Sequence, residues 1–161
     1  MDTHEAEQLA RSLMDQHGLA NWLFRFDRSI KRFGICRFPN RGKRGVISLS
    51  RPLVELNTVE TVKDTILHEI AHAIVGGSAG HGSAWKFQAR LLGARPVACQ
   101  SLENVVQVET AWMGTCPDCG LKAYRRRAPI LTAKYTHGKC KYAANRGHIR
   151  WTYNGHPIDS K

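Results

Sequence analysis

The sequence predicts an α+β protein built from two parts, and three observations support that prediction. Helical patterns and short strand-like runs alternate over residues 1–110. One predicted helix carries the spacing His-Glu-x-x-His at residues 68–72. From Trp112 onward the chain becomes more basic and holds three of the five cysteines. We therefore expect a larger domain at residues 1–110 and a smaller domain at residues 111–161.

The larger domain begins with a predicted helix and three short strands. Apolar residues recur at helical spacing between Ala6 and Met14, which predicts a helix over residues 3–17. Strand-like runs over residues 21–27, 33–39 and 46–50 predict strands, the first of them showing apolar–polar alternation. The run Asn-Arg-Gly-Lys-Arg-Gly at residues 40–45 predicts a turn with basic tips.

The His-Glu-x-x-His motif lies in the next predicted helix. Asn57 and Glu60 form a capping-box-like pattern at its start, and a pair of glycines at residues 76–77 marks its end. Apolar residues recur at helical spacing from Val59 to Ile74. A further helix is predicted over residues 83–92, and the run Asn-Val-Val-Gln-Val within residues 97–109 predicts a strand.

The motif has the spacing of a catalytic metal site. On a helix, His68 and His72 project from the same face and can bind one metal ion, while Glu69 lies beside them as a general base. Because a catalytic zinc takes three protein ligands, a third ligand must come from elsewhere. His81 is the first candidate, since the glycines before it let the chain turn back; Glu103 and Glu109 are the alternatives. The longer metzincin spacing is excluded, because positions 75 and 78 hold Val and Ser instead of Gly and His.

The motif and its surroundings resemble the SprT-like zinc metalloproteases, a group that includes the Spartan proteases, which degrade proteins cross-linked to DNA. Two segments carry the resemblance, Thr-Ile-Leu-His-Glu-Ile-Ala-His-Ala and His-Gly-Ser-Ala-Trp. The matching positions are His68, Glu69, His72, His81, Gly82 and Trp85. Many members have an N-terminal helix, a few strands, the active-site helix and a small zinc ribbon, a layout that covers nearly the whole chain. The resemblance implies a small zincin-type metalloprotease domain, zinc peptidase chemistry and a link to nucleic acid.

The C-terminal cysteines predict a second metal site. Cys116 and Cys119 form one pair with two-residue spacing, and His137 and Cys140 form another. Two such pairs at this separation predict a closed, tetrahedral zinc site in a ribbon, which would gain much of its folding free energy from the metal. The family usually has four cysteines, so His137 is a departure, and His148 is the alternative fourth ligand. A redox dithiol is excluded, because no thioredoxin-like pattern surrounds the first pair.

The net charge is +11, and residues 112–161 contribute +8 of it through ten Lys or Arg and two Asp or Glu. Such a segment indicates contact with a polyanion, most often nucleic acid. Aromatic residues lie among the basic ones and can stack on bases, although Trp151 and Tyr153 also fit the core of the ribbon itself. The predicted nucleic-acid contacts are Arg125, Arg126, Arg127, Lys139, Lys141, Arg146 and Arg150.

These observations favour a zinc-dependent endopeptidase with one catalytic and one structural Zn²⁺, acting on proteins bound or cross-linked to nucleic acid. DNA is the expected nucleic acid, single-stranded DNA included. The alternative is a non-catalytic zinc-ribbon protein that binds nucleic acid, but a purely structural metal site needs no base such as Glu69. We expect a cytoplasmic or nucleoid-associated protein that is not secreted, because the N-terminus lacks the features of a signal peptide. We expect no membrane partner, because no apolar run approaches the roughly 18 residues needed to span a membrane. Cys36 and Cys99 lie between apolar residues and are expected to be small buried hydrophobic residues.

Overall fold

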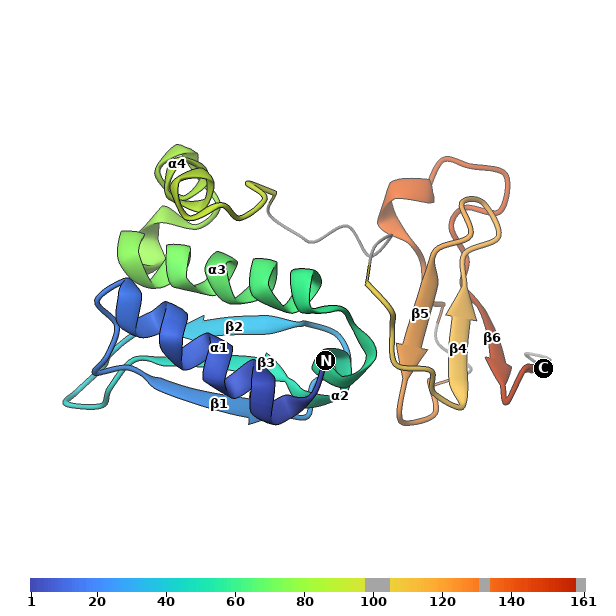
Figure 1. Ribbon diagram of the computed structural model, residues 1–161. Helices are drawn as coiled ribbons and strands as arrows, with labels where there is room; N and C mark the ends of the chain where they lie inside the picture. Colours follow the sequence, from blue (N-terminus) through green and yellow to red (C-terminus); the bar gives the residue numbers. More distant parts are fainter. Residues whose placement is uncertain (98–104, 131–133, 159–161) are drawn as a thin grey trace. The chain divides into compact units, whose positions relative to one another are not determined.

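The computed structural model describes residues 1–97, 105–130 and 134–158. The chain divides into two compact units, Met1–Gln107 and Val108–Lys161, and each contains its own sheet (Figure 1). This is the mixed α+β architecture that the sequence predicts. Cys99 and Glu103 lie outside the described residues. None of the described helices is long and apolar enough to cross a membrane.

The first unit begins with one helix, continues with three strands and ends with helices. Its elements are α1 (Thr3–Gln16), β1 (Leu23–Asp27), β2 (Gly34–Arg37), β3 (Val46–Ser50), α2 (Arg51–Leu56), α3 (Val59–Val75), a 3-10 turn (Gly77–Ala79) and α4 (Ser83–Leu92). The predicted helices and strands of residues 3–92 are therefore confirmed, with small changes at their ends. The predicted strand within residues 97–109 is wrong for residues 105–109, which form no strand.

The sequence missed the short helix α2, and for that reason it placed the cap of α3 on the wrong residue. Ser50 caps α2 by accepting a hydrogen bond from the backbone N–H of Leu53. Asn57 ends α2 and donates from its side chain to the Leu53 carbonyl. The cap of α3 is Thr58, whose Oγ1 accepts from the backbone N–H of Thr61.

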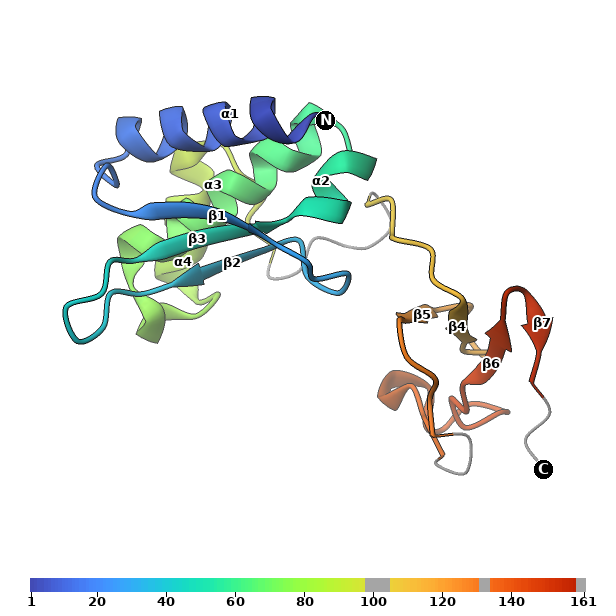
Figure 2. The same cartoon turned by 90° about the horizontal axis from the view of Figure 1, so that it is seen from below.

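The three strands of the first unit form a sheet in the order β1-β3-β2, which leaves β2 at an edge. β1 runs parallel to β3, and β2 runs antiparallel to β3. Phe24, Ile47 and Leu49 are buried on one face, and α1 and α3 lie on that side of the strands (Figure 2). The burial of this face fixes α3 against the edge strand β2, which contacts it directly.

Helix α3 is buried along its middle and exposed at its ends. Val62, Ile66 and Ile70 are fully buried, whereas Val59 in the first turn and Ile74 in the last turn are exposed. Helix α4 packs on α3 and inserts the fully buried side chain of Trp85. The two helices therefore hold the segment between them, residues 76–82, close to the C-terminal half of α3.

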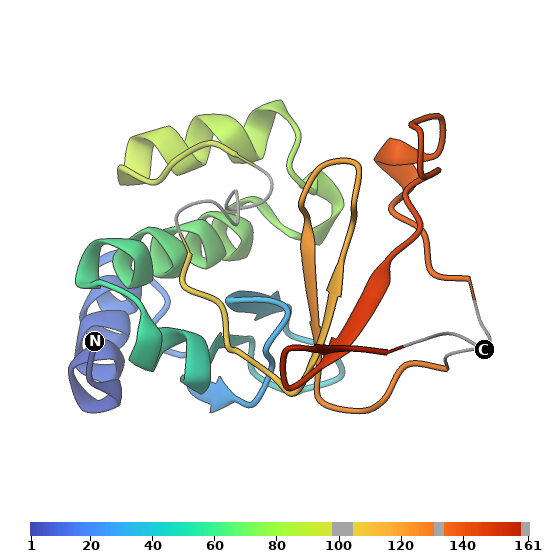
Figure 3. The ribbon, with the colours of Figure 1, turned by 90° about the vertical axis from the view of Figure 1, so that its right-hand side faces the viewer.

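The second unit is a small sheet with two loops at one end. Its elements are β4 (Trp112–Thr115), β5 (Lys122–Arg125), a 3-10 turn (Gly138–Cys140), β6 (Arg150–Tyr153) and β7 (His156–Pro157). The strand order is β5-β4-β6-β7, and all neighbouring strands are antiparallel. Figure 3 shows β5, β4 and β6 side by side. The loop after β4 carries Cys116 and Cys119, whereas His137 caps the 3-10 turn and Cys140 ends it.

Candidate metal centres

Helix α3 places two imidazoles one above the other. His68 and His72 are four residues apart, and their ring centroids lie 5.1 Å from each other. The helix ends one turn beyond His72, where Gly76 adopts a φ of 85°. Residues other than glycine rarely adopt that conformation, so Gly76 fixes the point where the chain leaves the helix.

The segment after α3 returns a third imidazole to the first two. His81 Nε2 lies 3.1 Å from His68 Nε2 and 3.0 Å from His72 Nε2. Gly80 precedes His81 with a φ of 49°, which lets the chain reverse there. The structure thus brings His81 to the motif, as the sequence predicts. Of the alternatives, Glu109 is not in this group, and Glu103 lies outside the described residues.

The three imidazoles fit a tetrahedral metal ion. Zinc–nitrogen bonds of the usual length would put two ligand nitrogens roughly 3.3 Å apart, close to the observed separations. Burial, together with the neighbouring imidazoles, lowers the pKa of His68 to about 4. Burial and the nearby His81 lower the pKa of His72 to about 4. Both rings are therefore neutral at pH 7 and keep the lone pairs that a metal ligand needs.

The indole ring of Trp85 packs against all three imidazoles. Its ring centroid lies 4.6 Å from that of His68, 5.2 Å from that of His72 and 4.5 Å from that of His81. Its indole N–H donates to the His68 carbonyl at 3.4 Å. In the sequence Trp85 was singled out only through the family resemblance, and the structure gives it a physical role, which is to orient the three rings.

Glu69 lies beside the imidazoles and faces the edge strand. Its side chain is buried, and its residue exposure is only 6%. Burial raises the pKa of its carboxyl to about 7, although a backbone hydrogen bond from Cys36 and the charge of Arg32 act in the opposite direction. A carboxyl with this pKa can both accept and release a proton near neutral pH, as a general base must.

A cleft of about 370 Å³ opens over these side chains, between the edge strand and α3. Its lining residues are Gly34, Ile35, Cys36, Phe38, His68, Glu69, His72, Gly77, Gly80 and His81. Cys36 was predicted to be a buried hydrophobic residue, and this is wrong, because it is half-buried and lines the cleft. The edge position of β2 exposes that face, and local sequence does not reveal which strand is at an edge.

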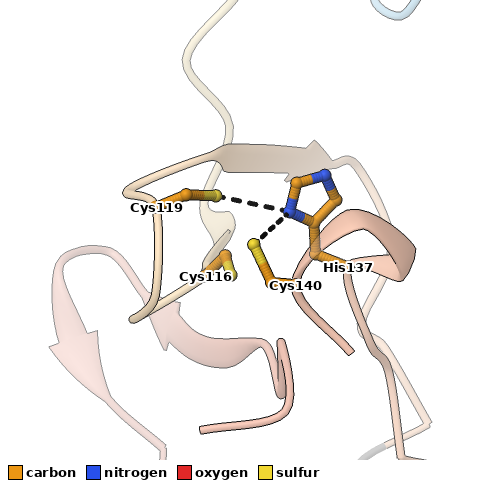
Figure 4. A group of neighbouring side chains, drawn as sticks. All are labelled: Cys116, Cys119, His137 and Cys140. Atoms are coloured by element: carbon orange, nitrogen blue, oxygen red, sulfur yellow. Dashed lines mark hydrogen bonds between the residues drawn. The ribbon is translucent and has the colours of Figure 1, made fainter. Parts of the chain in front are cut away.

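The second unit gathers the four predicted ribbon ligands. The ligand atoms of Cys116, Cys119, His137 and Cys140 all lie within 4.8 Å of one another. His137 Nδ1 is 3.3 Å from both the Cys119 and Cys140 sulfurs, and the four side chains converge on one point (Figure 4). This group fits a zinc ribbon, with three sulfurs and one nitrogen in a closed arrangement. His148, the alternative ligand, is not in the group.

The thiols of this group also favour a bound cation. Hydrogen bonds with the Leu121 backbone and the Cys140 side chain lower the pKa of Cys119. The hydrogen bond with Cys119 is the main cause, and burial the second, that raises the pKa of Cys140 to about 12. Without a cation the sulfurs therefore cannot all be thiolates at pH 7, whereas a zinc ion at the centre would stabilise all of them in that form.

Asp118 joins the two ligand loops, a role that no prediction from the sequence assigns to it. Its carboxylate accepts hydrogen bonds from the Asn145 backbone and side-chain N–H groups, both at 2.9 Å, and from the Gly147 N–H at 2.7 Å. These contacts lower the pKa of Asp118. The sequence holds one indication of this role. Asp118 lies between Cys116 and Cys119, so its side chain is close to both ligands.

The predicted nucleic-acid contacts separate into two kinds. Arg125 is half-buried, and its guanidinium carbon lies 5.2 Å from the Tyr135 ring centroid and 5.7 Å from that of Trp151. Trp151 also packs edge-on against Tyr135, which supports the view that it belongs to the core of the ribbon. Tyr153 is 43% exposed. The remaining predicted contacts are all exposed: Arg126, Arg127, Lys139, Lys141, Arg146 and Arg150.

Comparison with protein families identifies the first unit. The model of the SprT-like family matches residues 4–108, which is more than half of the chain. The match ends before the second unit's cysteines and therefore rests on the unit that holds the three imidazoles and Glu69. No curated protein matches the chain.

Proposed function

Because the chain belongs to the SprT-like family, we propose that it is a zinc-dependent endopeptidase that acts on proteins bound or cross-linked to nucleic acid. One observation carries the catalytic part of this proposal. A buried carboxyl with a pKa of about 7, Glu69, lies in a cleft beside three imidazoles that converge on one point. The family gives residues 4–108 a zincin-like metalloprotease character, and the cleft gives a peptide a place to bind.

Each residue of the cleft would have a separate role in peptide hydrolysis. His68, His72 and His81 would hold Zn²⁺, which supplies a Lewis acid for the peptide carbonyl and for water. The Glu69 carboxylate would take a proton from the attacking water and deliver it to the nitrogen of the breaking C–N bond. Trp85 would keep the imidazoles in place, and the edge strand would hold Glu69 in its buried position.

The ribbon would supply the link to nucleic acid. Cys116, Cys119, His137 and Cys140 would hold a second, structural Zn²⁺. The six predicted contacts that are exposed are available to neutralise phosphates. In this proposal residues 1–110 cut the protein substrate and residues 111–161 bind the DNA, single-stranded DNA in particular, to which the substrate is attached.

The variant Glu69→Gln tests the proposal against a non-catalytic, purely nucleic-acid-binding protein. We expect it to retain wild-type zinc content and wild-type DNA binding while it loses cleavage of a protein cross-linked to single-stranded DNA. The matched control is Glu55→Gln, which removes an exposed carboxylate on α2 and should cleave like the wild type. Wild-type protein that binds two zinc ions and DNA but cleaves neither itself nor the cross-linked protein would favour the non-catalytic alternative.

A further inference from the structure

The first unit carries a concentration of positive charge that the proposed function does not use. Residues 25–51 hold nine Lys or Arg and a single acidic residue, Asp27, which gives a net charge of +8. The other residues of the segment 1–111 together carry −5, so the modest total of +3 conceals this contrast. Eight of the nine cations lie on the strands and loops of residues 25–50, whereas α1 and α3 each carry a net charge of −2.

These cations are exposed, and few of them have an acidic partner. All nine are exposed to solvent. Arg32 forms an ion pair with Asp27, the single acidic residue of the segment. Among the described residues no ion pair involves the other eight. Like charges on a folded surface repel one another, and a bound polyanion relieves that repulsion.

The pairing of the strands shows where the charges face. Arg25 alternates with the buried Phe24, and Arg37 alternates with Cys36, which lies on the side of Glu69 and α3. Arg25 and Arg37 therefore point to the sheet face opposite α1 and α3. Figure 2 shows these two helices on one side of the strands. The hairpin between β2 and β3 extends past the sheet and carries Arg41, Lys43 and Arg44 at its tip (Figure 1).

An exposed aromatic ring connects this hairpin with the cleft. Phe38 follows Arg37 directly, is 37% exposed, and lines the cleft. The ring of Trp22 packs edge-on against it, with centroids 6.3 Å apart. Cations beside an accessible aromatic ring are the combination that single-stranded nucleic acids bind, because phosphates pair with the cations and bases stack on the ring.

We propose that the β2–β3 hairpin and the adjoining sheet face bind the phosphate backbone of a nucleic acid at the rim of the cleft. The peptidase unit thus has a nucleic-acid site of its own, in addition to the ribbon. A strand bound along Arg41, Lys43 and Arg44 passes Phe38, so a protein attached to that strand lies near Glu69. Binding at this surface requires no turnover, and it can be measured in protein that does not cleave.

The test compares two triple variants of the full chain, both in the Glu69→Gln background. The first is Arg41→Gln/Lys43→Gln/Arg44→Gln. The control is Lys63→Gln/Lys86→Gln/Arg90→Gln, which removes the same charge from exposed positions of α3 and α4. Fluorescence anisotropy with labelled single-stranded DNA, measured between about 50 and 200 mM salt, gives the affinity and its salt dependence. Zinc content and melting temperature establish that both variants are folded.

We expect the hairpin variant to lower the log–log salt slope by about two units, since each lost phosphate contact on a single strand contributes about 0.7. The control should change the slope by less than half of that. The same difference should persist when Arg126→Gln and Arg127→Gln are added, because the two surfaces act separately. Double-stranded DNA and RNA of equal length show which backbone is preferred.

Equal slopes for the hairpin variant and the control would overturn the proposal. It would also be overturned if the hairpin variant bound nucleic acid normally but lost binding to polyglutamate or to anionic lipid vesicles. Neither result depends on whether the wild type cleaves proteins, so failure of this inference is distinct from failure of the proposed peptidase activity.

Discussion

A Cβ atom added to Gly34 would lie 2.7 Å from Oε1 of Glu69. Gly34 opens the edge strand β2, and Glu69 lies on α3, 35 positions further along the chain. The absence of a side chain at position 34 therefore lets the carboxyl of Glu69 pack directly against the strand. This close approach buries the carboxyl, and burial is the main cause of its raised pKa.

Substitution Gly34→Ala should displace the Glu69 carboxyl without removing the metal. The nearest atoms to the added methyl group belong to Glu69 and Thr65, and none belongs to the three imidazoles. We expect cleavage to fall by about 10²-fold, the cost of a shift of about 1 Å in a catalytic group. Zinc analysis should still find two ions per chain. Gly138→Ala, which places the same methyl group in open space, should leave cleavage unchanged. Equal activity of the two variants would mean that the contact with Gly34 does not position Glu69.

The raised pKa of Glu69 predicts a pH-dependent stability difference between the metal-free wild type and metal-free Glu69→Gln. Between pH 4.5 and about 7 the unfolded chain releases the Glu69 proton while the folded chain keeps it. The wild type therefore loses stability as the pH rises through this window, and the glutamine variant does not. Above pH 7 the variant should be more stable by about 3 kcal/mol, and the difference should vanish toward pH 4.5. Urea unfolding of both proteins in chelator, at a series of pH values, measures the difference, and a constant difference would contradict the assignment.

Substitution Cys116→Ser should unfold the ribbon and leave the imidazole site loaded. Cys116 is fully buried among the ligands of the second unit, whereas His68, His72 and His81 all belong to the first unit. Zinc per chain should fall from two ions to one, and limited proteolysis should cut within residues 108–161. Cys36→Ser, at a cysteine that is outside the ribbon group, should retain both ions. Loss of both ions from the Cys116 variant would show that the two units do not fold separately.

The three consecutive arginines of the ribbon should differ in what their removal does. Arg125→Ala removes a guanidinium from the rings of Tyr135 and Trp151, so it should destabilise the ribbon by about 1 kcal/mol. Arg126→Ala with Arg127→Ala should leave the melting temperature unchanged, because both side chains are exposed. That pair should instead lower the salt slope of single-stranded DNA binding by about 1.4 units. If Arg125→Ala lowered the salt slope and left the stability of the ribbon unchanged, Arg125 would belong to the nucleic-acid-binding surface.

The sequence by itself determined the features that repeat over short distances. Periods of two to four residues predict β1 to β3, the helices α1, α3 and α4, the one-turn spacing of His68 and His72, and the two pairs of ribbon ligands. Such periods are local properties of the backbone, and they remain visible without knowledge of the fold. The sequence also indicated His81 as a ligand, because the glycines before it predict a reversal of the chain.

Contacts between distant segments were decided by the tertiary structure. Neither the position of β2 at the sheet edge nor the approach of Gly34 to Glu69 has a local signature. The first depends on how the strands pair, and the second depends on how α3 packs against β2. The same holds for Arg125, which lies in a basic run but packs against rings that later segments supply. The sequence shows that the turn at residues 40–45 is basic, but only the fold shows that Phe38, next to this turn, lines the cleft. Burial and charge at a site are sums over many segments, so only the folded chain defines them.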